Sequence, residues 1–178
     1  NRQYHILTKW IDNNTPKSTD HNKMLCINYS PQTNPERVTL LNKARNEWSE
    51  FCNILPFIEN LKSYTIPSHI EGKIRINVTN PKCYDDWKEY KFVLSPQGAG
   101  VDCHRTWEAI HIGCIPIVMS TTINELYEDL PILVVKNWND INLELLTSSY
   151  DKIVAKRDRN EYNMEKLTLE YWTKLIES

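Results

Sequence analysis

Long hydrophobic runs are missing from this chain of 178 residues. No apolar stretch approaches the length of about 18 residues that suggests a membrane-spanning helix, so we expect no membrane segment in it. An excess of one charge is also missing, because 21 Lys and Arg residues face 23 Asp and Glu residues, for a net charge of −2. Nucleic-acid binding needs a basic surface, so nucleic acid is not an expected partner. Hydrophobic residues at 40% and charged residues at 25% are typical of a globular protein, and the length fits about one domain.

Cysteine is present, but its pattern fits neither a zinc ribbon nor a disulfide framework. The five cysteines are odd in number and include no CxxC pair; they are Cys26, Cys52, Cys83, Cys103 and Cys114. A zinc ribbon is therefore not expected, and a complete set of disulfides is impossible. Cys26 and Cys114 adjoin apolar runs and are expected to be small buried hydrophobes.

The cellular compartment is left open by the sequence. Asn13, Asn28 and Asn77 each begin an Asn-x-Ser/Thr glycosylation triplet, which would fit the lumen of the Golgi. Such triplets arise often by chance in a chain rich in asparagine. We therefore favour the cytoplasm and keep the Golgi lumen as the alternative.

Apolar runs alternate with amphipathic stretches along most of the chain. This alternation predicts an α/β fold of the Rossmann-like, doubly wound type, with a mostly parallel sheet and helices on both faces. We expect residues 1–22 to be a linker or extension, 23–157 to be the domain, and 158–178 to be a long C-terminal helix packed on it. Strands are expected over residues 23–29, 63–67, 73–79, 91–94, 115–119 and 130–136. Helices are expected over residues 35–53, 81–90, 122–129 and 158–177, and from about residue 142.

The most informative stretch reads YKFVLSPQGAGVDCHRTWEAIHIGCIPIVMS, from Tyr90 to Ser120. Its pattern predicts a strand, a glycine-bearing loop, a helix capped by Asp102 and closed by Gly113, and a second buried strand. A loop that leads into a helix N-terminus presents unpaired N–H groups and the positive end of the helix dipole. This segment therefore predicts a site for a phosphate or diphosphate.

Charged side chains in the predicted helix are the main candidates for function. Arg105 has a forked set of donors that suits a diphosphate, although it could instead be a surface arginine paired with Glu108. His104 could donate to a phosphate or sugar hydroxyl, or be a partly buried structural histidine. Glu108 could accept hydrogen bonds from ribose or sugar hydroxyls, or be an exposed helical residue.

The loop and a second helix start supply further candidates. Gly98 and Gly100 are expected to allow a close backbone approach and positive φ angles, and Ser95 and Gln97 to bond the ligand. Arg37 follows another predicted strand whose loop opens on the same edge of the sheet. It is as much a candidate for neutralising phosphate as it is for a solvated helix residue.

Aromatic and acidic neighbours carry weaker interpretations. Asp102 is a better candidate for the helix cap than for a catalytic base. Trp107 and Trp138 are expected in the core rather than as platforms that stack a base. Tyr127 is a candidate for the lining of the ligand pocket.

Two rival sites share these residues. His104, Glu108 and His111 are spaced to share one helix face, which is compatible with a metal site but lacks the HExxH pattern and an evident fourth ligand. Gly98 and Gly100 begin like a dinucleotide fingerprint, yet Cys103 stands where its third glycine belongs. We favour neither a metal nor a dinucleotide cofactor.

Three runs in the sequence together resemble the C-terminal half of exostosin-like glycosyltransferases. They are FVLSPQGAGVDCHRTWEAIHIGCIPIV, LYEDLPILVVKNWNDI and INYSPQTNPER. The likeness is greatest to the short exostosin-related enzymes of protists, algae and large DNA viruses, and it extends over nearly the whole chain. Arg105 falls on the arginine of the family's motif.

The resemblance implies a specific activity. It implies the GT-B donor-binding domain of an inverting, metal-independent glycosyltransferase, which transfers a sugar from a nucleoside diphosphate to a glycan or glycoprotein hydroxyl. A UDP-sugar is favoured over a GDP-sugar, and Arg105 and His104 would stabilise the leaving diphosphate. Because the chain is too short for two such domains, the acceptor domain and its base are expected on an N-terminal domain or partner chain. The alternative is a non-catalytic nucleotide-sugar-binding module that acts with a partner domain.

Overall fold

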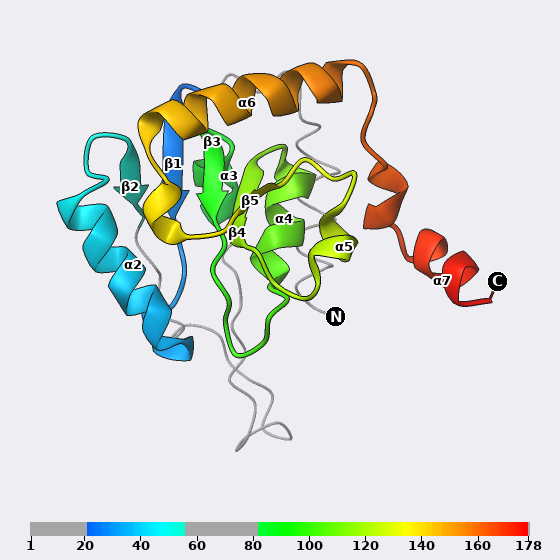
Figure 1. Ribbon diagram of the computed structural model, residues 1–178, viewed down its shortest axis with the longest axis horizontal. Coiled ribbons are helices and arrows are strands. Elements are labelled where there is room, and N and C mark those ends of the chain that lie inside the picture. Colours follow the sequence, from blue (N-terminus) through cyan, green and yellow to red (C-terminus); the bar gives the residue numbers. More distant parts are fainter. Residues whose placement is uncertain (1–20, 56–81, 178) are drawn as a thin grey trace.

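A parallel sheet of five strands forms the centre of the computed structural model, which describes residues 21–55 and 82–177 (Figure 1). The strands are β1 (Lys23–Ile27), β2 (Cys52–Ile54), β3 (Tyr90–Leu94), β4 (Ile115–Met119) and β5 (Leu133–Val135). Their order is β2-β1-β3-β4-β5, and every neighbouring pair is parallel. This confirms the predicted α/β fold with a parallel sheet. The strands expected over 63–67 and 73–79 lie outside the described residues.

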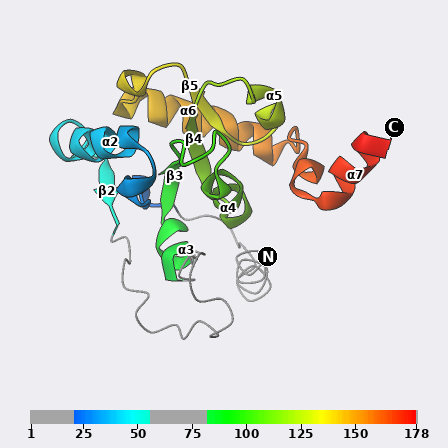
Figure 2. The same ribbon diagram turned by 90° about the horizontal axis from the view of Figure 1, so that it is seen from below.

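Helices cover both faces of the sheet (Figure 2). On one face lie α2 (Pro35–Asn46) and α6 (Leu143–Asp158), and on the other lie α3 (Lys82–Trp87) and α4 (His104–Ile112). A short helix, α5 (Asn124–Tyr127), precedes β5, and α7 (Leu169–Glu177) projects from the body at the C-terminal end (Figure 1). The remaining turns of helix are η1 (Pro31–Thr33), η3 (Trp138–Asp140) and η4 (Met164–Leu167).

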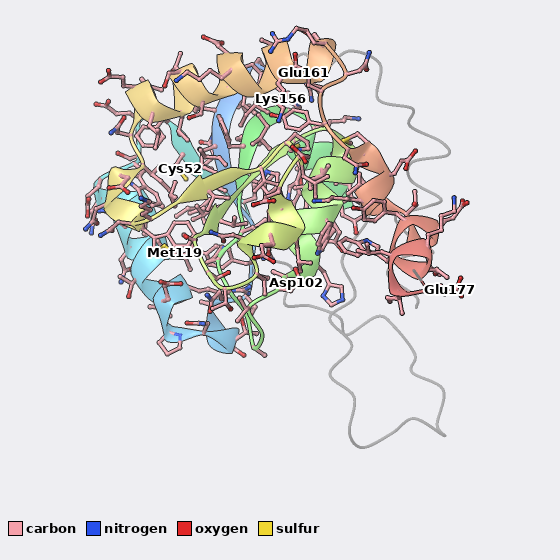
Figure 3. The ribbon with its side chains drawn as sticks, turned by 45° about the vertical axis from the view of Figure 1, so that its right-hand side comes forward. Cys52, Asp102, Met119, Lys156, Glu161 and Glu177 are labelled. Carbon is pink, nitrogen blue, oxygen red and sulfur yellow. The ribbon has the colours of Figure 1, made fainter. Side chains whose placement is uncertain are left out.

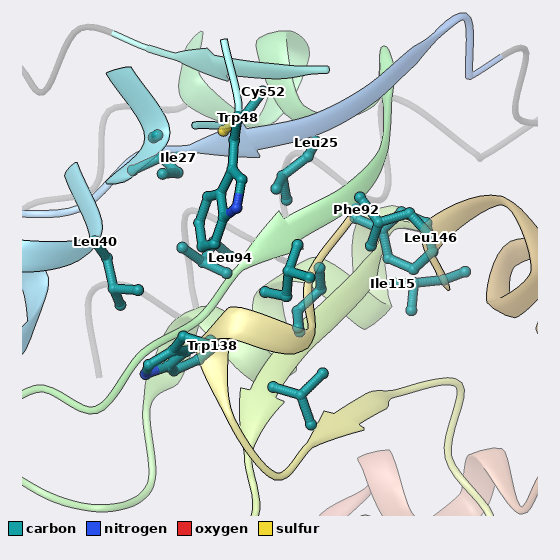
Figure 4. Packing of buried hydrophobic residues seen from close by; sticks show 14 of the residues in the cluster. Leu25, Ile27, Leu40, Trp48, Cys52, Phe92, Leu94, Ile115, Trp138 and Leu146 are labelled. Atoms are coloured by element: carbon teal, nitrogen blue, oxygen red, sulfur yellow. The ribbon is translucent and has the colours of Figure 1, made fainter. Parts of the chain in front are cut away.

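Alternation along the central strands divides the core into two layers. Leu25, Ile27, Phe92 and Leu94 pack toward α2 and α6, in the cluster shown in Figure 4. Cys26 belongs to the layer that packs toward α3 and α4. Because both faces of each central strand are covered, these strands read as continuous apolar runs in the sequence.

The strand order reverses at β1, which lies between β2 and β3. The chain passes from β1 to β2 on one side and later enters β3 on the other side of β1. In doubly wound sheets, ligands bind outside the carboxyl ends of the strands where the order reverses in this way. The relevant loops are therefore those after β1 and β3.

Asparagine side chains cap the starts of two helices, and a third helix ends at the predicted glycine. The side chain of Asn34 accepts from the Glu36 N–H at 2.9 Å at the start of α2. Asn142 does the same for Leu145 at the start of α6, at 2.8 Å. Gly113 ends α4 in the left-handed conformation, with φ of 92°.

Several helix boundaries were predicted wrongly. The helix expected over 81–90 ends at Trp87, and Tyr90 begins β3. The helix from Pro35 was expected to reach residue 53, but it ends at Asn46, and Cys52 instead pairs with Leu25 in the sheet. Strand pairing and the burial of Trp48 in the core outweigh the helical spacing of these apolar residues.

The single C-terminal helix expected over 158–177 is also not present. The chain leaves α6 through Asn160, whose φ is 54°, and then follows the turn at Asp129. The Asn163 N–H donates to the Asp129 carbonyl at 2.8 Å, and Lys166 Nζ donates to the Glu128 carbonyl at 2.6 Å. These tertiary hydrogen bonds divide the segment into η4 and α7.

No helix in residues 21–55 and 82–177 combines the length and the hydrophobicity that a membrane span requires.

Candidate anion-binding site

The segments predicted to carry function meet at the carboxyl ends of β1 and β3. The loop after β1 leads into α2, and the loop after β3, residues 95–103, leads into α4. Hydrogen bonds from Arg37 and Asn34 on the first side reach the backbone of the second. The structure therefore brings together loops that are about sixty residues apart in the sequence.

The N-terminus of α4 carries no side-chain cap. The cap residue is Cys103 and its side chain makes no capping hydrogen bond, so the prediction that Asp102 caps this helix was wrong. Asp102 Oδ1 instead accepts from Trp107 Nε1 at 2.9 Å and from the Tyr127 hydroxyl at 3.5 Å. The first N–H groups of α4 and its positive dipole end are left for another partner.

Arg105 lies in the first turn of α4, as predicted. Its Nε donates to the Asn28 carbonyl at 2.8 Å, at the end of β1, and its Nη1 donates to Cys103 Sγ at 3.5 Å. Its guanidinium also lies over the ring of Tyr29, 5.5 Å from the ring centre. Nη2 has no hydrogen-bond partner among the described residues, so a fork of donors is still available for an anion. Arg105 is not the arginine paired with Glu108 that the sequence left as an alternative.

Arg37 is buried, with 4% of its surface exposed. It donates from Nε to the Gln97 carbonyl at 2.8 Å and from Nη2 to the Pro96 carbonyl at 3.0 Å. It also donates from Nη1 to the Ser30 carbonyl at 3.2 Å. The alternative of a solvated helix residue was therefore wrong. Each nitrogen of its guanidinium already has an acceptor, which leaves little for a ligand.

No carboxylate of the described residues lies within ion-pairing distance of either arginine. Burial lowers the pKa of Arg37, and the neighbouring charge of Arg105 lowers it further. Two guanidinium groups and an uncapped helix N-terminus thus give the region between the two loops after β1 and β3 a positive charge that no side chain of the described residues neutralises. Such a site suits an anion with several oxygen atoms.

The loop residues contribute differently from one another. The Ser95 hydroxyl is buried and bonds the Thr106 hydroxyl at 2.9 Å, so it ties β3 to α4 instead of facing a ligand. Gln97 takes part through its carbonyl, which accepts from Arg37. Gly98 lies close to Arg37: a Cβ atom there would be 3.1 Å from Arg37 Nη2, a tight contact that the guanidinium would have to relieve by moving a few tenths of an ångström.

Gly100 neither makes a close approach to a neighbouring group nor has a positive φ angle. A Cβ atom at Gly100 would make only an ordinary contact, 3.8 Å from the Asp102 carbonyl oxygen. Of the glycines in the described residues, only Gly113 has a positive φ, so the expectation of positive φ at Gly98 and Gly100 was wrong.

A cavity of about 590 Å³ adjoins the anion site on the side of α4 that faces η4 and α7. In Figure 3, Asp102 lies just before α4, on the side of the molecule from which α7 projects to Glu177. Trp107 and Trp172 supply large apolar surfaces in the cavity lining. The other lining residues are Asp102, His104, Glu108, His111, Lys166, Leu167, Thr168 and Leu169.

Glu108 lines this cavity from a buried position, with 8% of its surface exposed, so it is not the exposed helical residue of the alternative interpretation. Its Oε1 accepts from the Tyr84 hydroxyl at 3.2 Å. Burial raises the pKa of Glu108, and Arg105, the Tyr84 hydrogen bond and His104 act in the opposite direction. A carboxyl group held in this way can accept hydrogen bonds from hydroxyl groups in the cavity.

His104 and His111 lie on either side of Glu108 along the cavity. His104 is exposed, at the first position of α4. Burial lowers the pKa of His111, which favours its neutral form. Within residues 21–55 and 82–177, no three His, Cys, Asp or Glu side chains are grouped to hold a metal ion, and this includes the His104–Glu108–His111 face.

Several residues of the site were not predicted from the sequence. Trp107 was expected in the core and instead lines the cavity, whereas Trp138 is buried in the core as expected. Tyr127, the candidate for the pocket lining, is instead buried beside Trp107, with ring centres 6.1 Å apart, and is not among the residues that line the cavity. The sequence did not predict Lys166 and Trp172 in the site. A single helix was expected over 158–177, so the turn that brings these residues to α4 was not predicted. Tyr29 had a signal that was overlooked, since it lies two residues after the end of the central strand β1, at Ile27.

Comparisons with known proteins add nothing to this picture: no family model matches the chain, and no curated protein is similar to it. The case for any function therefore depends on the geometry of the site.

Proposed function

We propose that this domain binds the diphosphate of a nucleoside-diphosphate sugar and supports transfer of the sugar to a glycan hydroxyl. The observation that carries the proposal is the pair of arginines at the end of β1 and β3. Arg105 keeps free donors beside the uncapped N-terminus of α4, and Arg37 adds a second positive charge that no described carboxylate neutralises. A diphosphate matches this arrangement in charge and in number of acceptors.

The same groups would assist the chemistry of transfer. When the bond from the sugar to the diphosphate breaks, negative charge develops on the leaving phosphate. The helix N-terminus and Arg105 are fixed before the reaction, since Arg105 is held by Asn28 and Cys103. Fixed donors stabilise developing charge at a low cost in reorganisation. His104, one residue earlier, is placed to donate a further hydrogen bond from the edge of the cavity.

We propose that the rest of the donor binds in the cavity beside α4. Its volume of about 590 Å³ is sufficient for a nucleoside or a sugar ring. Glu108 is the residue for which we propose hydrogen bonds with ribose or sugar hydroxyls, and Tyr84 holds its carboxyl group in place. The uridine nucleotide is favoured by the resemblance to exostosin-like enzymes.

A second candidate is a module that binds the nucleotide sugar without catalysing transfer. It is favoured by the state of the carboxyl groups nearest the anion site. Asp102 already accepts from Trp107 and Tyr127, and Glu108 is buried and bonded to Tyr84. Neither is arranged to take a proton from an acceptor hydroxyl, so we expect the base to come from a partner domain. The chain by itself should bind the donor and transfer poorly.

The test is calorimetric titration of the purified 178-residue chain with UDP, GDP, CMP and NAD, each with and without EDTA. We expect saturable binding of one nucleoside diphosphate that EDTA does not change. At a concentration of one hundred times its Kd, that ligand should stabilise the fold by about 2.7 kcal/mol in a parallel melting experiment. Absence of binding by both UDP and GDP, or binding of NAD alone, would contradict the proposal. Rapid sugar transfer by the chain alone would contradict only the expected need for a partner.

A further inference from the structure

Successive carbonyl groups of the loop after β3 all face the first turn of α2. The Pro96 carbonyl accepts from Arg37 Nη2 at 3.0 Å, and the Gln97 carbonyl accepts from Arg37 Nε at 2.8 Å. The next carbonyl, that of Gly98, accepts from Asn34 Nδ2 at 3.3 Å. This part of the loop is therefore fastened to α2 by side chains, before the chain enters α4.

Arg37 also fastens the loop after β1. Its Nη1 donates to the Ser30 carbonyl at 3.2 Å, and its own carbonyl accepts from the Tyr29 hydroxyl at 3.2 Å. One buried residue therefore connects the loop after β1 with the loop after β3. Arg105 depends on the same frame, because its Nε donates to Asn28, directly before Tyr29.

From these contacts we infer that Arg37 is a positioning residue: it holds the Pro96–Cys103 loop and so fixes the start of α4 and the direction of Arg105. A side chain at Gly98 would press on the guanidinium of Arg37, because its Cβ atom would lie 3.1 Å from Nη2. That this matters for nucleotide affinity rests on the proposed function, whereas the fastening of the loop does not. The role differs from the direct neutralisation of phosphate that the sequence suggested for Arg37.

The chemistry of the guanidinium explains why arginine is needed there. Three carbonyl oxygens approach Arg37 from separate directions, and they would otherwise place partial negative charge around an anion site. A planar fork can donate to all three at once. A lysine ammonium has the same charge but donates from a single atom, so it cannot reproduce this geometry.

The experiment separates position from charge by means of two variants and one matched control. Arg37→Lys keeps the charge and loses the fork. Gly98→Ala keeps the arginine and places a methyl group 3.1 Å from its Nη2. Gly100→Ala is the control, because its added methyl group would make only an ordinary contact, 3.8 Å from the Asp102 carbonyl oxygen. Circular dichroism and melting would establish that each variant is folded.

The first measurement needs no nucleotide. Cys103 Sγ lies 3.6 Å from Arg37 Nη2 and 3.5 Å from Arg105 Nη1, and among the described cysteines it alone is not buried. We expect Arg37→Lys and Gly98→Ala to increase the rate at which a maleimide labels Cys103 by at least about threefold, and Gly100→Ala to leave it unchanged. Equal labelling rates in all four proteins would overturn the inference.

The second measurement is the Kd of the nucleoside diphosphate that the wild-type chain binds. Loss of hydrogen bonds to a charged group should weaken binding in both Arg37→Lys and Gly98→Ala by about tenfold or more. Wild-type affinity in Arg37→Lys would show that charge alone is needed and would overturn the positioning role. If the wild-type chain binds no nucleoside diphosphate, the proposed function fails, and the labelling rates alone decide whether Arg37 holds the loop.

Discussion

Arg37 and Arg105 hold their guanidinium groups against the same aromatic ring, that of Tyr29, at 5.1 and 5.5 Å from its centre. Two like charges at one ring repel each other, and the electron-rich face of the ring offsets only part of this cost. The carbonyl groups that accept from each arginine offset another part. The fold thus maintains a local excess of positive charge at the end of β1, which a bound anion would relieve.

The free donors of Arg105 lead to the first prediction. Arg105→Ala should weaken binding of the nucleoside diphosphate by about 10- to 150-fold, because a hydrogen bond to a charged group contributes about 1.5–3 kcal/mol. The measurement is calorimetric titration at fixed ionic strength. Arg45→Ala removes an exposed arginine of α2 whose guanidinium donates, within the part of the chain that the structure describes, to Asn42, and it serves as the control for loss of one charge. An equal effect of the two substitutions would mean that only net charge matters.

Gly113 leads to a prediction about stability. It ends α4 with φ of 92°, a conformation that residues with a Cβ atom rarely adopt. Gly113→Ala should therefore lower the free energy of unfolding by about 1–2 kcal/mol. Urea denaturation followed by circular dichroism measures this change. Gly100→Ala, at a glycine without positive φ, should differ little from the wild type, and comparable losses at both positions would contradict the argument.

The cysteines lead to a prediction about reactivity. Cys103 is half-buried at the start of α4, whereas Cys26, Cys52, Cys83 and Cys114 are buried. Burial raises the pKa of Cys52 and of Cys114 to about 12, so their thiolates are scarce at neutral pH. We expect one thiol in the native protein to react with Ellman's reagent much faster than the others, and peptide mapping should assign it to Cys103.

A bound nucleoside diphosphate should slow this reaction, since it would lie beside Arg105 at the start of α4. Phosphate-free nucleoside at the same concentration is the control. If Cys103 reacts no faster than the buried cysteines, the loop after β3 is packed more tightly than its contacts with Arg37 and Arg105 suggest.

The sequence predicted the parts of the fold that local chemistry decides. The glycine at Gly113 identified the end of α4, and the apolar runs identified the central strands. It failed where a tertiary contact decides. The turn after α6 depends on hydrogen bonds from Asn163 and Lys166 to a distant turn, which no local pattern reveals.

In the candidate site, too, the sequence predicted what local pattern decides and missed what tertiary contacts decide. The position of Arg105 in the first turn of α4 followed from the loop and helix pattern. The role of Arg37 did not, because its partners Pro96 and Gln97 are about sixty residues away in the sequence. Likewise the cap at Asp102 was a sound local interpretation, but the indole of Trp107 and the hydroxyl of Tyr127 both compete for its carboxylate.

Glu108 leads to a prediction about pH. Its folded pKa is raised by burial above the ordinary value of 4.5, despite the opposing effects of Arg105, Tyr84 and His104. Below the unfolded pKa the group is protonated in both states, and its contribution to stability is fully present. Between the unfolded and the folded pKa, the carboxyl group is ionised in the unfolded chain but still protonated in the folded protein, which favours unfolding. The contribution to stability is therefore lost as the pH rises through the folded pKa. Each tenfold difference in proton affinity between the two states corresponds to about 1.4 kcal/mol.

Glu108→Gln removes this titration while keeping an acceptor for the Tyr84 hydroxyl. Relative to the variant, the wild-type protein should therefore lose stability as the pH rises above 4.5, the ordinary value for the group, and the difference should become constant above the folded pKa. Urea denaturation at a series of pH values, at constant ionic strength, measures this difference. Glu50→Gln, at an exposed position, is the control whose profile should run parallel to that of the wild type. A parallel profile for Glu108→Gln as well would mean that the carboxyl group of Glu108 stays solvated enough to ionise freely, and the cavity beside α4 would then be open to water in solution.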